Sequence, residues 1–199
     1  MNINFTKTSH IAFFGALIPM SSWFISQWFF EMFPYWPSWL EGPSPIVVYG
    51  IIYLLFDKYL WKWSGFKKLG IVCFPNLNGR WKGTQQSSYK ENGKNVEVEA
   101  RLEITQTFSK VCVRGYYSKS DSESIAASFS ESNDQVYLFF TYDNDPDSLK
   151  TGTMQKHKGS VKMRILPTEK IIRGCYWNSI GNFGEMNYEF EQPELLGRF

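Results

Sequence analysis

Cysteine and histidine are scarce in this sequence, which has three cysteines and two histidines. The cysteines, Cys73, Cys112 and Cys175, are widely spaced and form no Cys-x-x-Cys motif. This spacing argues against a disulfide framework or a zinc site and favours buried thiols in a reducing compartment. With so few histidines, no Ser-His-Asp or Cys-His set is convincing. We therefore expect no enzyme, no metal and no cofactor.

The chain also lacks a strong excess of either charge, because 21 Lys and Arg stand against 19 Asp and Glu. The small positive surplus comes from lysines before residue 75, and basic and acidic residues are equal in number after it. A protein that binds DNA or RNA needs a basic excess to neutralise phosphates. We therefore expect no polymeric nucleic acid partner, and an anionic ligand must be small and locally held.

Charged residues are missing from Ile11 to Phe30, "IAFFGALIPMSSWFISQWFF". A helix of about twenty such residues matches the hydrocarbon core of a bilayer, which predicts a membrane span at residues 11–30. A cleaved signal peptide is the alternative, since Lys7 precedes the run. The length of the run, the lack of a small-x-small cleavage site and a second hydrophobic segment favour the span.

The second hydrophobic segment, residues 45–63, is strictly apolar only from Ile46 to Phe56. It is credible as the return helix of a hairpin, because Lys58 and Lys62 lie four residues apart and can both reach the headgroup region. The connecting loop has no Lys or Arg, whereas four lysines crowd the end of the second segment. The positive-inside rule then places both termini in the cytoplasm. We expect residues 1–70 to form a two-helix transmembrane hairpin.

Small and hydroxylated residues share one face of the first predicted span. The stripe comprises Gly15, Pro19, Ser22 and Ser26. Such a stripe allows close helix packing. Packing against the second span and packing between copies of the chain are equally good interpretations.

From Gly79 to Phe190, apolar and polar residues alternate in short segments separated by turn sequences, which predicts β-strands. We expect eight strands, at residues 79–88, 95–108, 110–119, 123–131, 135–142, 152–166, 170–179 and 183–191. The segment Asn144-Asp145-Pro146 is interpreted as a turn and not as a calcium loop. The predicted fold of residues 75–199 is an eight-stranded up-and-down antiparallel β-barrel, lipocalin-like, because closure removes the unpaired edges of such a meander.

The period of two also predicts which side chains face the barrel interior. On the fourth strand these are Ile125, Ala127 and Phe129, and on the eighth they include Tyr188. The Gly79-x-Trp81 pair resembles the opening of lipocalin-type barrels, in which the tryptophan plugs one end. Gln106 is the one polar inward residue expected at that end.

Polar inward residues gather at the opposite, membrane-distal mouth, where odd strands end and even strands begin. The candidate ligand-binding residues are Gln85, Tyr117, Tyr142, His157, Tyr176 and Asn178, with Lys156 and Lys158 flanking the histidine. Few polar groups among aromatic walls are typical of a ligand site, and the lysines suit an anion. The alternative is that the tyrosines fill the barrel and His157 is a rim residue.

Four motifs follow one another along the chain: "LNGRWKG" (77–83), "FTYDNDP" (140–146), "HKGSVKM" (157–163) and "IIRGCYWNSIGNFGEM" (171–186). With the two hydrophobic segments before them, they resemble the two-transmembrane β-barrel effectors associated with CD-NTase enzymes in bacterial cyclic-oligonucleotide anti-phage signalling (CBASS). Gly174 and Tyr176 match a Gly-x-Tyr strand of that family, and residues 157–159 match its His-Lys-Gly.

The resemblance implies that the barrel is a receptor for a cyclic dinucleotide. It further implies that the ligand drives homo-oligomerisation, which damages the bacterial inner membrane. The alternative function is a membrane-tethered, lipocalin-like carrier of an apolar ligand. Such a carrier would have a mouth without basic residues.

Overall fold

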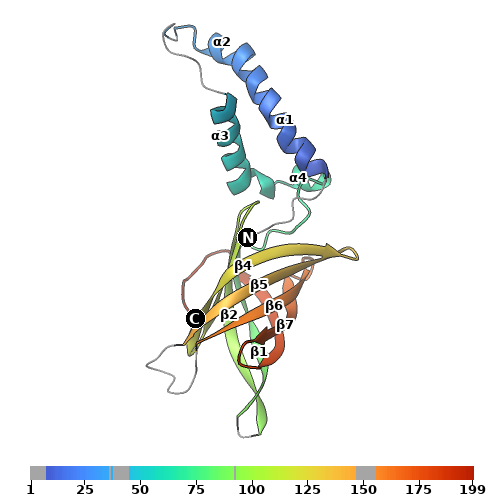
Figure 1. Ribbon diagram of the computed structural model, residues 1–199, viewed down its shortest axis with the longest axis vertical. Helices are drawn as coiled ribbons and strands as arrows, with labels where there is room; N and C mark the ends of the chain where they lie inside the picture. The colour runs from blue at the N-terminus through green and yellow to red at the C-terminus, as the bar shows by residue number, and fades with distance from the viewer. Residues whose placement is uncertain (1–7, 36, 38–44, 92, 147–155) are drawn as a thin grey trace. The chain divides into compact units, whose positions relative to one another are not determined.

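A computed structural model gives the fold of residues 8–35, 37, 45–91, 93–146 and 156–199. The chain divides into two compact units, Phe5–Cys73 and Phe74–Phe199. The first unit is helical and the second is a β-barrel (Figure 1).

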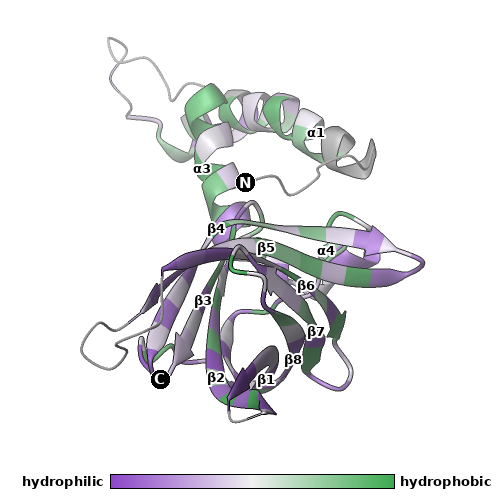
Figure 2. Cartoon of the chain, turned by 60° about the horizontal axis from the view of Figure 1, so that its bottom comes forward, coloured by the Kyte–Doolittle hydropathy of each residue, from purple (hydrophilic) through white to green (hydrophobic). Residues whose placement is uncertain are grey.

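The helical unit contains two long apolar helical segments. Its elements are α1 (Thr8–Phe24), the π-helix η1 (Ile25–Phe29), α2 (Phe30–Met32), α3 (Pro45–Lys58), the 3-10 helix η2 (Leu60–Lys62) and α4 (Ser64–Lys68). The rings of Phe13 and Phe14 on α1 contact Phe56 on α3 at centroid distances of 5.2 and 5.7 Å. Hydrophobic residues cover much of both helices (Figure 2).

Helices occupy both predicted segments, residues 11–30 and 45–63, but with other bounds. α1, η1 and α2 follow one another without a break from Thr8 to Met32. α3 ends at Lys58, short of the predicted limit at Trp63, because Tyr59 leaves the helical conformation. None of the helices in the described part of the chain combines the length and the apolar character needed to cross a membrane.

The predicted packing stripe on the first helix does not face α3. Its described members are exposed: Gly15, Pro19 and Ser22. The side chain of Ser26 lies outside the described residues. The buried side chains of this segment are instead Leu17, Ser21 and Ile25. The structure therefore does not support packing of the stripe within the hairpin, and packing between copies stays a prediction.

The second unit is a closed barrel in which each strand pairs with its neighbours in the chain and β1 pairs with β8. The strands are β1 (Gly79–Glu91), β2 (Lys94–Gln106), β3 (Val111–Tyr117), β4 (Ser120–Ser132), β5 (Gln135–Pro146), β6 (His157–Leu166), β7 (Ile171–Asn178) and β8 (Phe183–Gln192). All eight pairings are antiparallel, so the predicted eight-stranded antiparallel barrel is confirmed. Hydrophobic and hydrophilic residues alternate along the strands (Figure 2).

A β-bulge in β4 makes one predicted interior residue wrong. The pairing of β4 with β5 shifts between Ser124 and Ala126, and Ile125 is 58% exposed on the outer face. The extra residue reverses the alternation, so Ser120 and Ser122 face inward before the bulge and Ala127 after it. Ser124 Oγ accepts a hydrogen bond from the Val113 N–H at 2.9 Å, which replaces a ladder bond there.

The predicted turn at Asn144-Asp145-Pro146 is wrong, because β5 continues through these residues to Pro146. Asn144 pairs with His157 and is buried. The carboxamide of Asn144 thus belongs to the interior. Residues 152–155, the predicted start of the sixth strand, lie outside the described residues.

The end of the barrel where β1 begins, here called the near end, is sealed. Trp81 is buried and its indole N–H donates to the Leu77 carbonyl at 3.0 Å. The ring of Phe74 stacks on Phe129 with centroids 5.0 Å apart. Gln106 accepts from the Leu77 N–H at 2.8 Å and donates to the Pro75 carbonyl at 3.1 Å. Gln106, the one polar inward residue predicted at this end, therefore holds the segment that leads into β1 through two hydrogen bonds.

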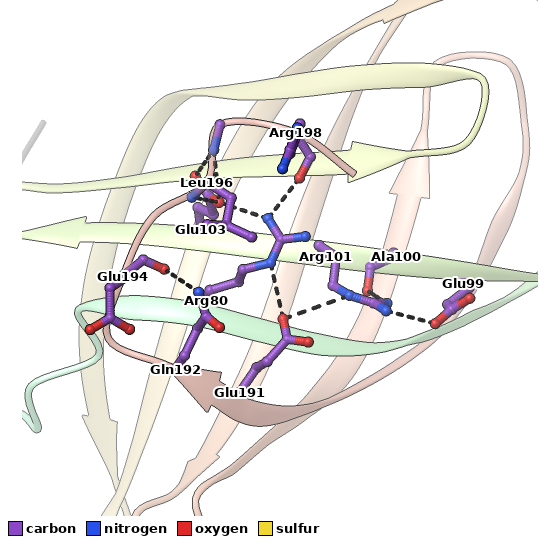
Figure 3. Close-up of polar contacts among 11 residues, drawn as sticks. Arg80, Glu99, Ala100, Arg101, Glu103, Glu191, Gln192, Glu194, Leu196 and Arg198 are labelled. Atoms are coloured by element: carbon purple, nitrogen blue, oxygen red, sulfur yellow. Dashed lines mark hydrogen bonds and ion pairs between the residues drawn. The ribbon is translucent and has the colours of Figure 1, made fainter.

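A buried ion pair on the outside of the near end holds the C-terminal segment against β1 and β2 (Figure 3). Arg80 and Glu103 are adjacent across the two strands, with Nη1 and Oε1 2.8 Å apart and side chains only 4% and 5% exposed. Glu103 Oε1 also accepts the Leu196 N–H at 2.7 Å and the Gly197 N–H at 3.1 Å. Arg80 also donates to Glu191 at 3.0 Å and to the carbonyl of Arg198 at 2.6 Å.

Replacing Glu103 by Ala leaves a buried guanidinium without its nearest carboxylate and two tail amides without an acceptor. We expect the free energy of unfolding to fall by about 3 to 5 kcal/mol. Urea unfolding of the full chain in detergent, followed by the β signal in circular dichroism, measures this change. The control is Glu99→Ala, since Glu99 is 61% exposed in its pair with Arg101 and its loss costs about 1 kcal/mol at most. Equal losses in both variants would contradict the prediction.

Candidate functional site

The polar residues of the barrel interior gather at the far end, where odd-numbered strands end and even-numbered strands begin. Four tyrosines dominate this region: Tyr117 (β3), Tyr142 (β5), Tyr176 (β7) and Tyr188 (β8). Tyr142, Tyr176 and Tyr188 are buried, with Tyr188 fully inaccessible to solvent. We call this group the tyrosine cluster.

Three of the four rings lie over a glycine of the neighbouring strand. Tyr142 is paired with Gly159, Tyr176 with Gly184 and Tyr188 with Gly83. A Cβ added at Gly184 would come within 2.8 Å of the Tyr176 ring, and one at Gly83 within 2.7 Å of the Tyr188 ring. A Cβ at Gly159 would overlap the phenol of Tyr142. The glycines therefore provide the space in which the tyrosines lie flat against the wall.

The hydroxyls of the cluster are only partly satisfied. Tyr117 Oη donates to Gln85 Oε1 at 3.1 Å. The buried Tyr188 hydroxyl interacts with the Tyr117 hydroxyl, which contributes to the raised pKa of Tyr188, but none of its contacts within the described residues has full hydrogen-bond geometry. A buried hydroxyl with an incomplete hydrogen bond is destabilising by up to about 1 to 3 kcal/mol, and a ligand acceptor would offset this cost.

Burial makes three tyrosines of the cluster, Tyr117, Tyr142 and Tyr188, resist ionisation. It raises the pKa of Tyr117 to about 12 and is also the main cause of the raised pKa values of Tyr142 and Tyr188. The hydroxyls therefore stay protonated at neutral pH. They can donate hydrogen bonds to ligand carbonyl, ring-nitrogen or phosphate oxygen acceptors.

Beside the cluster, His157 and two asparagines reach the rim. The His157 ring meets Tyr142 edge-on, with centroids 6.3 Å apart. Asn144 lies directly across the ladder from His157. Asn178 closes the β7–β8 turn, because its Oδ1 accepts the Asn182 N–H at 2.9 Å.

The two predicted lysines do not enter the interior with His157. Lys158 points outward and lies 3.8 Å from Asp143, and Lys156 lies 3.5 Å from Asp145. Both pairs are exposed, so salt and an incoming anion can exchange with them easily. The structure thus brings Gln85, the tyrosines and His157 together and leaves the lysines on the outer rim.

Sequence reasoning missed three residues of this region. Tyr188 was predicted to face inward but not to belong to the site, and Asn144 was assigned to a turn. Ser122, which interacts with the Tyr117 hydroxyl, was missed because it lies before the predicted fourth strand at residues 123–131, whereas β4 begins at Ser120. A signal for Ser122 was present, since Asp121 and Glu123 flank it and charged residues face outward.

Metal-ligating side chains do not cluster in the part of the chain that the structure describes. Among these residues, no group of three or more His, Cys, Asp or Glu side chains could hold an ion. The three cysteines are free, and Cys175 is exposed on the outer face, so the prediction that all three thiols are buried is wrong.

The raised tyrosine pKa values predict a loss of stability at alkaline pH. The unfolded chain loses the Tyr117 proton near pH 10, whereas the folded barrel holds it until about pH 12. The stabilisation is therefore complete below about pH 10 and is lost as pH rises through about 12. We expect Tyr117→Phe, which cannot ionise, to show a shallower decline than the parent chain in urea unfolding over this pH range. Identical slopes would overturn the prediction.

Comparison with known proteins assigns the family. A family model described as the Cap15 cyclic dinucleotide receptor domain matches residues 72–189. A CD-NTase-associated protein 15 from Yersinia aleksiciae is 34% identical over 137 residues, covering 67% of this chain and 62% of the relative. A protein of the same name from Escherichia albertii is 26% identical over 134 residues, covering 65% of this chain and 66% of the relative.

The matched residues 72–189 include all four tyrosines of the cluster and nearly all of the eight strands. Each match covers less than two thirds of the relative's own length. The expected resemblance to the CD-NTase-associated barrel effectors is confirmed. The chain belongs to the Cap15 family of CBASS effectors, and its barrel is that family's cyclic dinucleotide receptor domain.

Proposed function

We propose that the far end of the barrel binds a cyclic dinucleotide. The observation that carries this proposal is the cluster of buried aromatic rings at the far end, in which the Tyr188 hydroxyl makes no contact of full hydrogen-bond geometry within the described residues. The match to the cyclic dinucleotide receptor domain over the same strands supports it. The site then senses a nucleotide signal, and the barrel acts as the receptor of an anti-phage effector.

The chemistry of the cluster suits the bases of such a ligand better than its phosphates. Aromatic rings bind planar bases by stacking, worth about 1 to 3 kcal/mol per base. In the described part of the far interior, the inward positions of β5 to β7 carry no Lys or Arg. The phosphates therefore remain at the rim, beside His157 and within reach of the exposed Lys158. Tyr142 must turn away from Gly159 to admit a base.

The alternative, a carrier of an apolar ligand, is less well supported. The alkyl chain of a fatty acid would offer no acceptor to the Tyr188 hydroxyl and would bury further hydroxyl and amide groups at the mouth. The apolar half of the interior is sealed at the near end by Trp81 and Phe74. A ligand with several hydrogen-bonding groups fits this distribution.

We also propose that residues 11–30 and 45–63 anchor the chain in the bacterial inner membrane, with both termini and the barrel in the cytoplasm. Large apolar side chains are exposed on both helices, among them Trp23 on α1 and Leu54 on α3. An apolar surface of this kind is typical of contact with lipid. The lysines after α3 and the lysine-free loop support the orientation.

Ligand bound in one barrel cannot itself reach the bilayer, so its free energy must act through association between chains. Association raises the local concentration of the attached hairpins. The short apolar stretch from Ile46 to Phe56 thins a bilayer at a modest cost per chain, and crowding multiplies this cost. We propose that the clustered hairpins disrupt the membrane and stop growth.

If the ligand binds at the far end, substitutions of single residues there should each weaken its binding. Tyr188→Phe removes one hydroxyl and should weaken binding about fivefold, or about 1 kcal/mol. Tyr142→Ala and Tyr176→Ala should each lose about 1 to 3 kcal/mol of stacking, and Lys158→Ala a similar amount of charge-assisted bonding. Calorimetry of the detergent-solubilised chain with cyclic dinucleotides of adenine, guanine and uracil, and with fatty acids, measures this. Tyr89→Ala, at an exposed position of β1, is the control and should bind normally.

Unchanged affinity in all four variants, with an intact β signal, would remove the site from the far end. Binding of fatty acids alone would favour the carrier.

The anchor predicts that binding and toxicity separate on truncation. A chain lacking residues 1–70 should still bind the ligand but should not arrest the growth of cells, because it carries no hairpin. A reporter that is active only outside the cytoplasm should stay silent when fused after Phe199. Growth arrest by the truncated chain, or an active reporter, would contradict the proposed anchor and its orientation.

A further inference from the structure

The outer wall of the barrel carries a row of short side chains that ends in two large aromatic ones. Across the strands β4 to β8, the register runs Ala126, Thr141, Ser160, Trp177 and Phe183. Thr141, Ser160, Trp177 and Phe183 alternate with inward-facing neighbours and therefore point outward, and Ala126, which follows the bulge and precedes the buried Ala127, is also exposed. Trp177 is 49% exposed and Phe183 is 64% exposed.

The short side chains form the floor of a hollow of about 320 Å³. Phe139 and Trp177 also line this hollow, together with Thr141 and Ser160. On the other side of Trp177, the β7–β8 hairpin presents two exposed apolar side chains, Ile180 and Phe183. A hollow and an apolar projection thus lie on one face, on either side of β7.

A second row, next to the first, has opposite charges in the matching places. Lys162 on β6 and Glu185 on β8 are both paired with Cys175 on β7. Lys162 lies over the rings of Tyr137 and Phe139, at 4.9 and 5.5 Å, beside the hollow. Neither Lys162 nor Glu185 forms an ion pair with another described residue. The positive charge therefore accompanies the hollow, and the negative charge accompanies the projection.

We propose that this face, formed by the outward residues of β6, β7 and β8, binds the same face of a second copy of the chain. A two-fold axis along β7 exchanges the β6 side of one copy with the β8 side of the other. Phe183 of each copy then enters the hollow of its partner, and Lys162 meets Glu185 across the contact. Trp177 and Cys175 lie near the axis, where a buried aromatic residue contributes most to binding.

The equal numbers of acidic and basic residues in the barrel favour such a contact. A barrel without net charge has no long-range repulsion between copies, while the opposed local charges set the register. This inference specifies the contact through which chains associate in the proposed function. It depends on the proposed function only for the statement that the ligand triggers association.

Cysteine crosslinking tests the contact directly. The full-length chain in detergent, with Cys73 and Cys112 changed to Ser, is oxidised with copper phenanthroline with and without the cyclic dinucleotide panel. We expect a disulfide-linked dimer through Cys175 on a non-reducing gel, in at least one of the two conditions. No linked dimer in either condition would overturn the proposal.

Matched variants distinguish the contact from random collision. Phe183→Ser should weaken dimer formation about tenfold, whereas Tyr89→Ser, which changes an equally exposed aromatic residue of β1, should not. Lys162→Glu should reduce crosslinking, and Lys162→Glu with Glu185→Lys should restore it. Equal crosslinking in all variants would also overturn the proposal.

Calorimetry of the same variants separates this failure from failure of the proposed function. Crosslinking without binding of any cyclic dinucleotide would support the proposed contact between copies and contradict the proposed ligand. Binding without crosslinking would support the proposed ligand and contradict the proposed contact.

Discussion

Pairing of β1 with β8 closes the sheet and limits the volume inside it, because the interior of an eight-stranded barrel is wide enough only for its own side chains or for one small ligand. Four tyrosines fit into the far half of this space because three of them lie over glycines of the neighbouring strand. One of these pairs, Gly83 with Tyr188, spans the closing seam itself. A side chain at Gly83 would meet the backbone of β8, so the glycine permits both the closure and the position of the aromatic ring.

The two ends of the barrel treat their polar groups differently. At the near end, Gln106 is buried, and its side chain has partners in the chain that leads into β1. At the far end, the Tyr188 hydroxyl is buried and interacts with Tyr117, but none of its contacts among the described residues has full hydrogen-bond geometry. The buried amide of Gln106 is hydrogen-bonded through both its oxygen and its nitrogen, whereas the hydrogen bonding of the buried Tyr188 hydroxyl is incomplete. The loss of stability from this incomplete hydrogen bonding therefore lies at the end where a ligand acceptor would offset it. This asymmetry supports the proposal that recognition occurs at the far end.

The sequence predicted the barrel because strand alternation is local and eight segments of similar length repeat it. It did not predict the bulge, since Ile125, Ala127 and Phe129 continue a regular alternation and an extra residue leaves no mark on hydrophobicity. The outward direction of Lys158 could have been predicted, because the neighbours of an inward-facing residue on a strand face outward. Lys158 was instead grouped with the inward-facing His157 because the two residues are adjacent in the sequence. The burial of Arg80 and Glu103 was not available, because it depends on the path of the C-terminal segment, which no periodicity encodes.

Strand β7 places the two proposed surfaces back to back. Tyr176 faces the interior cluster, while Cys175 and Trp177, its neighbours in sequence, face outward. Its partner across the ladder, Gly184, lies between Phe183 and Glu185 of the outer face. A ligand changes association only if it binds the associated state more tightly than the separate one. A base that displaces the rings of the cluster acts on the backbone of β7 and β8, and the same backbone carries the projection, the tryptophan and the acidic charge of the outer face. Interior and exterior are thus joined through one hairpin, by the alternation of side chains that first predicted the strands.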